Sequence, residues 1–207
     1  MSSSIHEPET AAAKLGRPRC FCEETALDAA MRLFWERGYE GTSIADLTAA
    51  MGINRPSLYA TFGDKESLFR RAIERYAEGP MSYLSEALEQ PTARQVIDAL
   101  LYGTVDYLAD PTHPKGCMTV QGGITCGVES QAIKDELISR RIQGETRFRQ
   151  RFERARAEGD LGESIDPSDL ARYLVSMMNG LGIQAVNGAT VEEMNRVVDM
   201  SLRAINA

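Results

Sequence analysis

The 207-residue sequence has few of the groups on which enzymes and metal proteins depend. There are two histidines, His6 in an acidic N-terminal arm and His113 between two prolines, so no Ser–His–Asp or Cys–His unit is expected. No Gly-rich phosphate-binding loop is present, and no group of Cys and His has the spacing of a metal site. The sequence therefore predicts no enzyme activity, no cofactor and no metal.

Long apolar runs are also missing. No stretch approaches the roughly 18 residues of a transmembrane helix, and the first fifteen residues contain no hydrophobic signal segment. Four cysteines in a chain of this length do not make a disulfide framework. These absences predict a cytoplasmic protein that does not associate with membranes.

The net charge of −7 is unevenly distributed along the chain. Residues 14–75 carry ten Lys/Arg and nine Asp/Glu, whereas residues 76–207 carry thirteen and nineteen. The acidity thus lies mainly outside the N-terminal region. Any binding of that region to a polyanion depends on where its cations lie and should be salt-sensitive.

Residues 42–69 show the pattern of a helix, a glycine turn, a short second helix and the start of a third. Thr42 is expected to cap the first of these helices, and Gly52 to end it in the left-handed conformation. Asn54 is a good cap for the next helix, whose first turn tolerates Pro56, and Asp64 caps the one after. A helix-turn-helix places its second helix in a DNA major groove. The segment is therefore predicted to bind DNA.

The same region resembles the DNA-binding domain of the TetR family of one-component repressors. The resemblance covers about residues 17–75, and its most specific part runs from Leu58 to Phe69. The matching residues are Leu33-Phe34, Gly38-Tyr39, Thr42-Ser43-Ile44, Met51-Gly52-Ile53, Ser57-Leu58-Tyr59, Phe62 and Lys65-Glu66-Ser67-Leu68-Phe69. The resemblance implies a homodimeric repressor that a small-molecule effector releases from its operator.

The rest of the chain has helical periodicity interrupted by glycine and proline, with no strand pattern. We expect an all-α protein of about nine helices, with a three-helix helix-turn-helix head and a C-terminal helical ligand-binding and dimerisation domain. The expected divisions are a disordered arm over residues 1–16, the DNA-binding domain over 17–64 and the effector-binding and dimerisation domain over 65–207. The arginines between residues 147 and 156 are expected on a solvated helix face.

The predicted DNA contacts lie on the second helix of the motif and beside it. Asn54 and Arg55 carry groups that bind base edges bidentately, while Tyr59 and Lys65 suit phosphates. Arg17 lies in a basic arm that either reaches the minor groove, as such arms do in this family, or is a solvated tail. The partner is expected to be a double-stranded, pseudo-palindromic operator. The predicted contact set is Arg17, Thr42, Ser43, Asn54, Arg55, Ser57, Tyr59 and Lys65.

The last two helices have apolar residues on more than one face, although a surface helix needs only one. We interpret the extra face as a homodimer interface, in agreement with the family's usual two-helix dimerisation; the alternative is burial within the monomer. The predicted interface residues are Tyr173, Val175, Gly182, Val186, Met194 and Val198.

Aromatic and methionine side chains in the C-terminal region either line a cavity for an apolar effector or simply form core. The residues in question are Tyr102, Tyr107, Met118, Phe148, Met177 and Met178. The sequence identifies neither the effector nor the operator.

Two alternatives remain open at this point. In the first, oxidation of cysteine replaces the small molecule, and the candidates are Cys20, Cys22, Cys117 and Cys126. The first two cysteines lie close to basic residues that favour a thiolate, whereas the last two would point to opposite sides of a continuous helix. The second and less favoured alternative is a helical enzyme.

Overall fold

The computed structural model describes residues 22–120 and 130–205, so Arg17, Cys20 and Cys126 lie outside the described residues. Within these ranges the chain forms helices and no strands, and the predicted all-α fold is confirmed. No helix in the same ranges is long and apolar enough to cross a membrane. The helices are α1 (Glu23–Arg37), α2 (Ile44–Met51), α3 (Arg55–Phe62), α4 (Lys65–Glu78), α5 (Ser82–Leu88), α6 (Ala93–Ala109), α8 (Gln131–Ala157), α9 (Pro167–Val186) and α10 (Val191–Ile205).

Local side-chain bonds determine where the helices of the head begin and end. The Asn54 Oδ1 atom accepts a hydrogen bond from the Ser57 amide at 2.9 Å, which starts α3 as predicted. Asp64 Oδ1 accepts from the Ser67 amide at 2.7 Å and starts α4 in the same way. Gly52 ends α2 with a φ of 66°, in the left-handed region that glycine adopts without steric penalty. The turn between α2 and α3 is therefore specified by sequence.

The start of α2 differs from the prediction. Ser43, not Thr42, is its N-cap, and Ser43 forms a reciprocal capping box with Asp46. Thr42 is fully buried, and its hydroxyl donates to the Gly38 carbonyl at 2.8 Å. This bond joins the end of α1 to the start of α2. A side chain in that position cannot reach DNA, so the prediction of a DNA contact by Thr42 is wrong.

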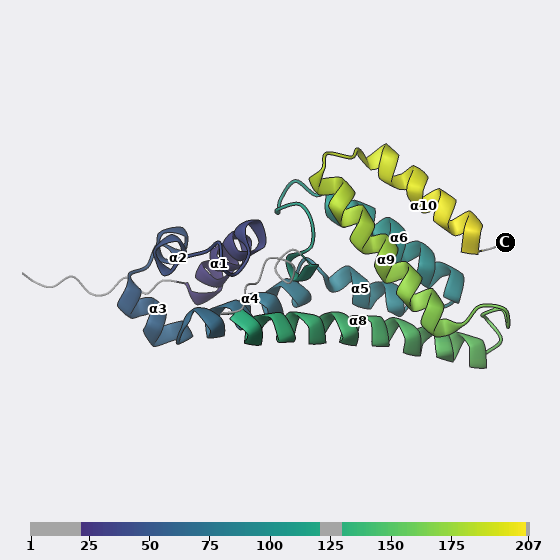
Figure 1. Cartoon of the computed structure of the whole chain (residues 1–207), viewed down its shortest axis with the longest axis horizontal. Coiled ribbons are helices and arrows are strands. Elements are labelled where there is room, and N and C mark those ends of the chain that lie inside the picture. The colour runs from purple at the N-terminus through teal and green to yellow at the C-terminus, as the bar shows by residue number, and fades with distance from the viewer. Residues whose placement is uncertain (1–21, 121–129, 206–207) are drawn as a thin grey trace, which may run out of the picture.

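The first three helices form a head at one end of an elongated molecule, and α4 leads from it into the rest (Figure 1). Phe34 of α1 meets Phe69 of α4 edge to face, with ring centroids 4.9 Å apart. The next residue of α1 is Trp35, whose indole Nε1 donates to the Gly116 carbonyl at 3.0 Å, across 81 residues of sequence. Head and C-terminal domain therefore share a continuous core at α1 and α4.

The C-terminal domain is arranged around the long helix α8. Figure 1 shows α8 running beside α4 and α5, with α9 returning at an angle from the C-terminal end of α8 and α10 lying on the outside over α6. Between α4 and α6 the Tyr76 and Tyr107 hydroxyls lie 2.6 Å apart, and burial raises the pKa of both. Both tyrosines remain neutral hydrogen-bonding groups of the core.

One arginine of α8 contributes to the fold. The prediction of a solvated face is wrong at Arg151, which is buried and donates from Nε to the Leu88 carbonyl at 3.0 Å. Its Nη2 atom donates to the Gln90 and Pro91 carbonyls at 2.8 and 3.3 Å. These acceptors lie at and just beyond the end of α5, where helix carbonyls have no intrahelical partner. Arg151 thus caps α5 from a different helix.

We expect Arg151→Met to lower the free energy of unfolding by about 2 kcal/mol, because it leaves carbonyls without a donor. Arg149→Met is the matched control, since Arg149 is exposed on the same helix; the control should stay within about 0.5 kcal/mol of wild type. Urea unfolding followed by circular dichroism measures both. Equal stability of the two variants would show that Arg151 contributes nothing beyond packing.

Candidate DNA-binding surface and ligand cavity

Helix α3 buries one face and exposes the other. Leu58 and Phe62 are buried against the head, whereas Asn54, Arg55 and Tyr59 are exposed, Tyr59 to 50%. In a helix-turn-helix the first residues of the second helix reach the base edges. Arg55 is the first residue of α3 and occupies that place.

Asn54 and Arg55, the two residues predicted to contact base edges, differ in the contacts that their side chains make within the chain. The Asn54 amide oxygen is engaged in the α3 cap, so a bidentate contact with adenine would require the cap to open. Arg55 makes no ion pair with any residue of the described ranges. Its five guanidinium donors are therefore available for a guanine edge. The geometry favours Arg55 over Asn54 as the reader.

Cations and capping groups surround α3. The Lys65 Nζ atom lies 4.2 Å from the centroid of the Tyr39 ring, a cation–π contact that holds the ammonium at the start of α4. Ser43 is exposed and Ser57 half-buried. The Ser43 hydroxyl holds the pKa of Asp46 below its ordinary value, so that carboxylate stays ionised within the cap. The Asp46 carboxylate also pairs with Arg37 of α1 at 3.5 Å, which partly neutralises its charge.

A cavity of about 290 Å³ lies among α4, α5, α8 and α9. Its size is near the lower limit for small-molecule sites, roughly 300 Å³. Phe148 and Met178, two of the predicted effector contacts, line it. The other apolar lining residues are Ile73, Tyr76, Ala77, Met81, Leu84, Cys117, Val120 and Val175.

Four of the predicted effector contacts lie elsewhere. The Tyr102 hydroxyl donates to Asp199 of α10 at 2.7 Å, on the outside of the domain. The Tyr107 hydroxyl lies between Tyr76 and the Gly116 carbonyl. Met118 is buried in the core, and Met177 lines a groove between α9 and α10. None of the four lines this cavity, so the structure does not bring them together with Phe148 and Met178, and their role as effector contacts stays a prediction.

The predicted dimer contacts divide into buried and exposed residues. Met194 and Val198 are almost completely buried in the chain's own core, so their prediction as interface residues is wrong. Gly182 is also buried, and Val175 lines the cavity. Tyr173 and Val186 are exposed, as predicted residues of an interface should be. The exposed large apolar residues near the α9–α10 turn and along α10 are Ile183, Val186, Val191, Val197 and Met200.

Two family models match the chain. Residues 26–72, which include α2 and α3, match the model of bacterial regulatory proteins of the tetR family. Residues 91–200 match that of the tetracyclin repressor-like C-terminal domain, which is more than half of the chain. The chain belongs to the TetR family. Its members are transcriptional regulators, as predicted from the motifs of residues 17–75.

Curated TetR-type relatives align over nearly the whole chain. The HTH-type transcriptional repressor ComR of Escherichia coli is 32% identical over 190 residues, covering 91% of this chain and 90% of ComR. The uncharacterized regulator YezE of Bacillus subtilis is 34% identical over 194 residues, covering 93% of this chain and all of YezE.

Solved TetR structures show the same architecture. A cysteine variant of the TetR regulator CifR, complexed with a 26-bp operator duplex, is 41% identical, with a TM-score of 0.87 over 92% of this chain and 100% of that chain. A TetR regulator from Rhodococcus sp. RHA1 is also 41% identical, with a TM-score of 0.61 over 89% of this chain and 99% of that chain.

Sequence reasoning missed the polar side of the cavity in this TetR protein. Arg140, Arg141 and Arg147 all line it, although α8 was read only for its apolar stripe and its solvated face. Arg141 and Phe148 are seven residues apart, which places them on the same side of a helix. That spacing was the available signal, but the cavity itself depends on how α8 packs against α4, which the sequence does not show.

The cysteine-oxidation alternative is not favoured. Cys22 is exposed at the start of α1, where Thr25 lowers its pKa. Cys117 follows Gly116, which contacts Trp35 near the other end of the same helix. At 1.5 Å per residue the thirteen residues from Cys22 to Trp35 span about 20 Å. The two described thiols are therefore too far apart to form a disulfide.

Proposed function

We propose that this TetR protein is a homodimeric repressor that binds a pseudo-palindromic operator through α3 of each subunit and leaves it when a small molecule fills the cavity. The observation that carries this proposal is the similarity, over 92% of the chain, to a CifR cysteine variant bound to its operator. The exposed face of α3, with Arg55 at its start, supplies the groups that such binding requires.

The chain has the overall fold of a DNA-complexed CifR variant, with a TM-score of 0.87 over 92% of its length. We propose that the described arrangement of α4 against α8 is the one that binds operator. A ligand that favours another arrangement lowers operator affinity by its difference in affinity for the two states.

We also propose that the chain divides into an arm (1–16), a DNA-binding domain (17–64) and an effector-binding and dimerisation domain (65–207). The role is regulation rather than catalysis, and its place is the cytoplasm, where the chromosome lies. Capture of genomic fragments by the purified protein, followed by sequencing, tests the proposal directly. Recovery of no fragment above background would contradict it.

Lys65→Ala should weaken binding by a similar factor on operator and on unrelated DNA. Phosphate contacts carry no sequence information, and Lys65 is held at the rim of α3 by Tyr39. The slope of log affinity against log salt should fall by roughly one. Fluorescence anisotropy at several salt concentrations measures both quantities.

Lys115→Ala is the matched control, because Lys115 is an exposed lysine of the C-terminal domain. Its salt slope should equal that of wild type. If Lys65→Ala also keeps the wild-type slope, Lys65 makes no phosphate contact and its role is confined to packing on Tyr39.

A further inference from the structure

The cavity carries positive charge that its own walls do not neutralise. Arg141 donates to the Thr119 carbonyl at 2.6 Å, and Arg147 donates to the Ser85 hydroxyl at 3.1 Å. Both acceptors are neutral, and neither guanidinium forms an ion pair within the described ranges. The only acidic residue in the described lining is Glu145, which pairs with Arg172 of α9 at 2.9 Å. The cavity is thus apolar on one side and cationic on the other.

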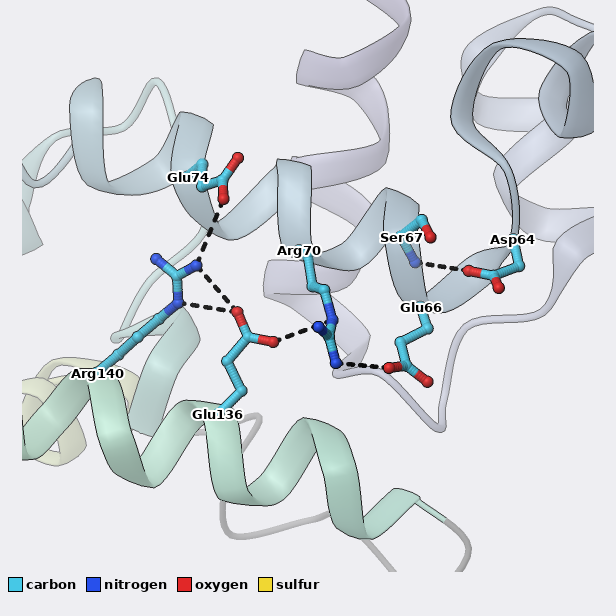
Figure 2. A network of polar contacts seen from close by, with 7 residues as sticks. All are labelled: Asp64, Glu66, Ser67, Arg70, Glu74, Glu136 and Arg140. Atoms are coloured by element: carbon cyan, nitrogen blue, oxygen red, sulfur yellow. Dashed lines mark hydrogen bonds and ion pairs between the residues drawn. The ribbon is translucent and has the colours of Figure 1, made fainter.

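Arg140 connects this cavity to the helix that leads to the DNA-binding head. It lines the cavity, and its Nη2 atom lies 2.9 Å from Glu136 of α8 and 3.7 Å from Glu74 of α4. Glu136 in turn pairs with Arg70 of α4 at 3.1 Å. Figure 2 shows these carboxylates and guanidiniums alternating across the space between α4 and α8. Within this network only Arg140 also faces the cavity.

The two ties between α4 and α8 differ in strength. The Glu74 side chain is 61% exposed and its contact with Arg140 is long, so this ion pair contributes little free energy and a competing anion breaks it readily. The pair of Arg70 with Glu136 is shorter, and the Glu136 side chain is only 20% exposed. A competing anion at Arg140 would therefore free Glu74 before it affects Arg70.

We propose that the effector is an organic carboxylate with an apolar body, whose acid group binds Arg140 and Arg141 and whose body lies against Phe148 and Met178. This inference rests on the proposed function and names the chemical class of its ligand. The acid group takes Arg140 from Glu74, while the body contacts Ile73 and Tyr76 on the same helix. Helix α4 then pivots at the Arg70–Glu136 pair and moves the head.

The ligand class is tested on the purified full-length protein by titration calorimetry, without DNA. The probes are octanoate and 4-tert-butylbenzoate, each compared with its alcohol, 1-octanol and 4-tert-butylbenzyl alcohol. We expect each acid to bind at least about tenfold more tightly than its alcohol, because a charge-assisted bond to arginine is lost in the alcohol. Equal binding of acid and alcohol, or no binding of either acid at millimolar concentration, would overturn the proposal.

Variants of α8 locate the acid group. Arg141→Gln and Arg140→Gln should each remove most of the preference for acid over alcohol. Arg149→Gln is the matched control, an exposed arginine of the same helix outside the cavity that pairs with Glu153. Thermal unfolding checks that each variant is folded. A preference that survives in both Arg141→Gln and Arg140→Gln would place the binding site elsewhere.

The coupling is tested with Glu74→Gln, which lies outside the cavity lining. This variant should bind the acids at least as tightly as wild type, since the competitor for Arg140 is gone. Saturating acid lowers the operator affinity of wild type by some factor. For Glu74→Gln we expect that factor to be at least threefold smaller. A full response would overturn the coupling through Arg140. If wild type binds acid but no DNA, the proposed function fails while calorimetry still decides the ligand class.

Discussion

Val186→Glu is expected to turn the protein into a folded monomer with operator binding at least about 100-fold weaker. Val186 and Ile183 of α9 are 50% and 54% exposed, and Met200 of α10 is 64% exposed, so both of the last two helices present large apolar side chains at the surface. A carboxylate buried there between two subunits would have no partner. Without the dimer the two heads no longer bind as one unit, which forfeits a factor of about 10²–10⁴.

Ser168→Glu is the matched control, because it places the same charge on the same helix but at its exposed first turn. A negative charge near a helix N-terminus is favourable there. Sedimentation velocity gives the oligomeric state, circular dichroism the fold and anisotropy the operator affinity. If folded Val186→Glu and Ile183→Glu both sediment as dimers, the interface does not include this end of α9.

The helix ends of the head could largely be predicted from sequence, because the residues that set them act on their near neighbours in the chain. Asn54, Gly52 and Asp64 act within three or four residues of their own positions. The error at Thr42 shows the limit of such reasoning. Thr42 and Ser43 are both good caps by type, and only the packing of α1 against α2 decides which of them is buried.

The dimer face could not be assigned because α9 and α10 have apolar residues on more than one face. Periodicity does not show which of these faces is buried within the subunit and which is exposed. Val198 and Val197 are neighbours on α10, yet the first is buried in the chain and the second is 39% exposed. Both positions are compatible with an apolar stripe at helical spacing. The contact of α10 with α6, including the bond of Tyr102 to Asp199, selects the buried side.

The cavity depends on contacts still farther apart in sequence. Arg147 meets Ser85 across 62 residues, and Arg151 meets Leu88 across 63. From composition both arginines belong to one basic run on one helix. The first lines a cavity and the second caps α5 only because α8 lies along α4 and α5. Charge patterning alone therefore predicted a solvated face where the protein has a cavity-lining arginine and a structural arginine.

Arg55→Ala should cost about 1–3 kcal/mol on the operator and clearly less on unrelated DNA, because Arg55 is placed to read a base edge. Arg55 begins α3, is exposed and has no ion-pair partner in the described ranges. Asn54→Ser provides the comparison within the same turn. Serine keeps the cap but has no amide group, so this variant should lose little if the role of Asn54 is to start α3.

Arg55→Lys separates base reading from simple charge. Lysine retains the cation but cannot form the planar two-bond contact, so unrelated DNA should be bound as by wild type while the preference for operator falls. Anisotropy with operator and scrambled duplexes at one salt concentration measures the ratio. An equal loss on both duplexes in Arg55→Ala, with no loss in Arg55→Lys, would show that Arg55 only binds phosphate. In that case a loss of preference in Asn54→Ser would identify Asn54 as the reader, and the α3 cap would have to open when the protein binds its operator.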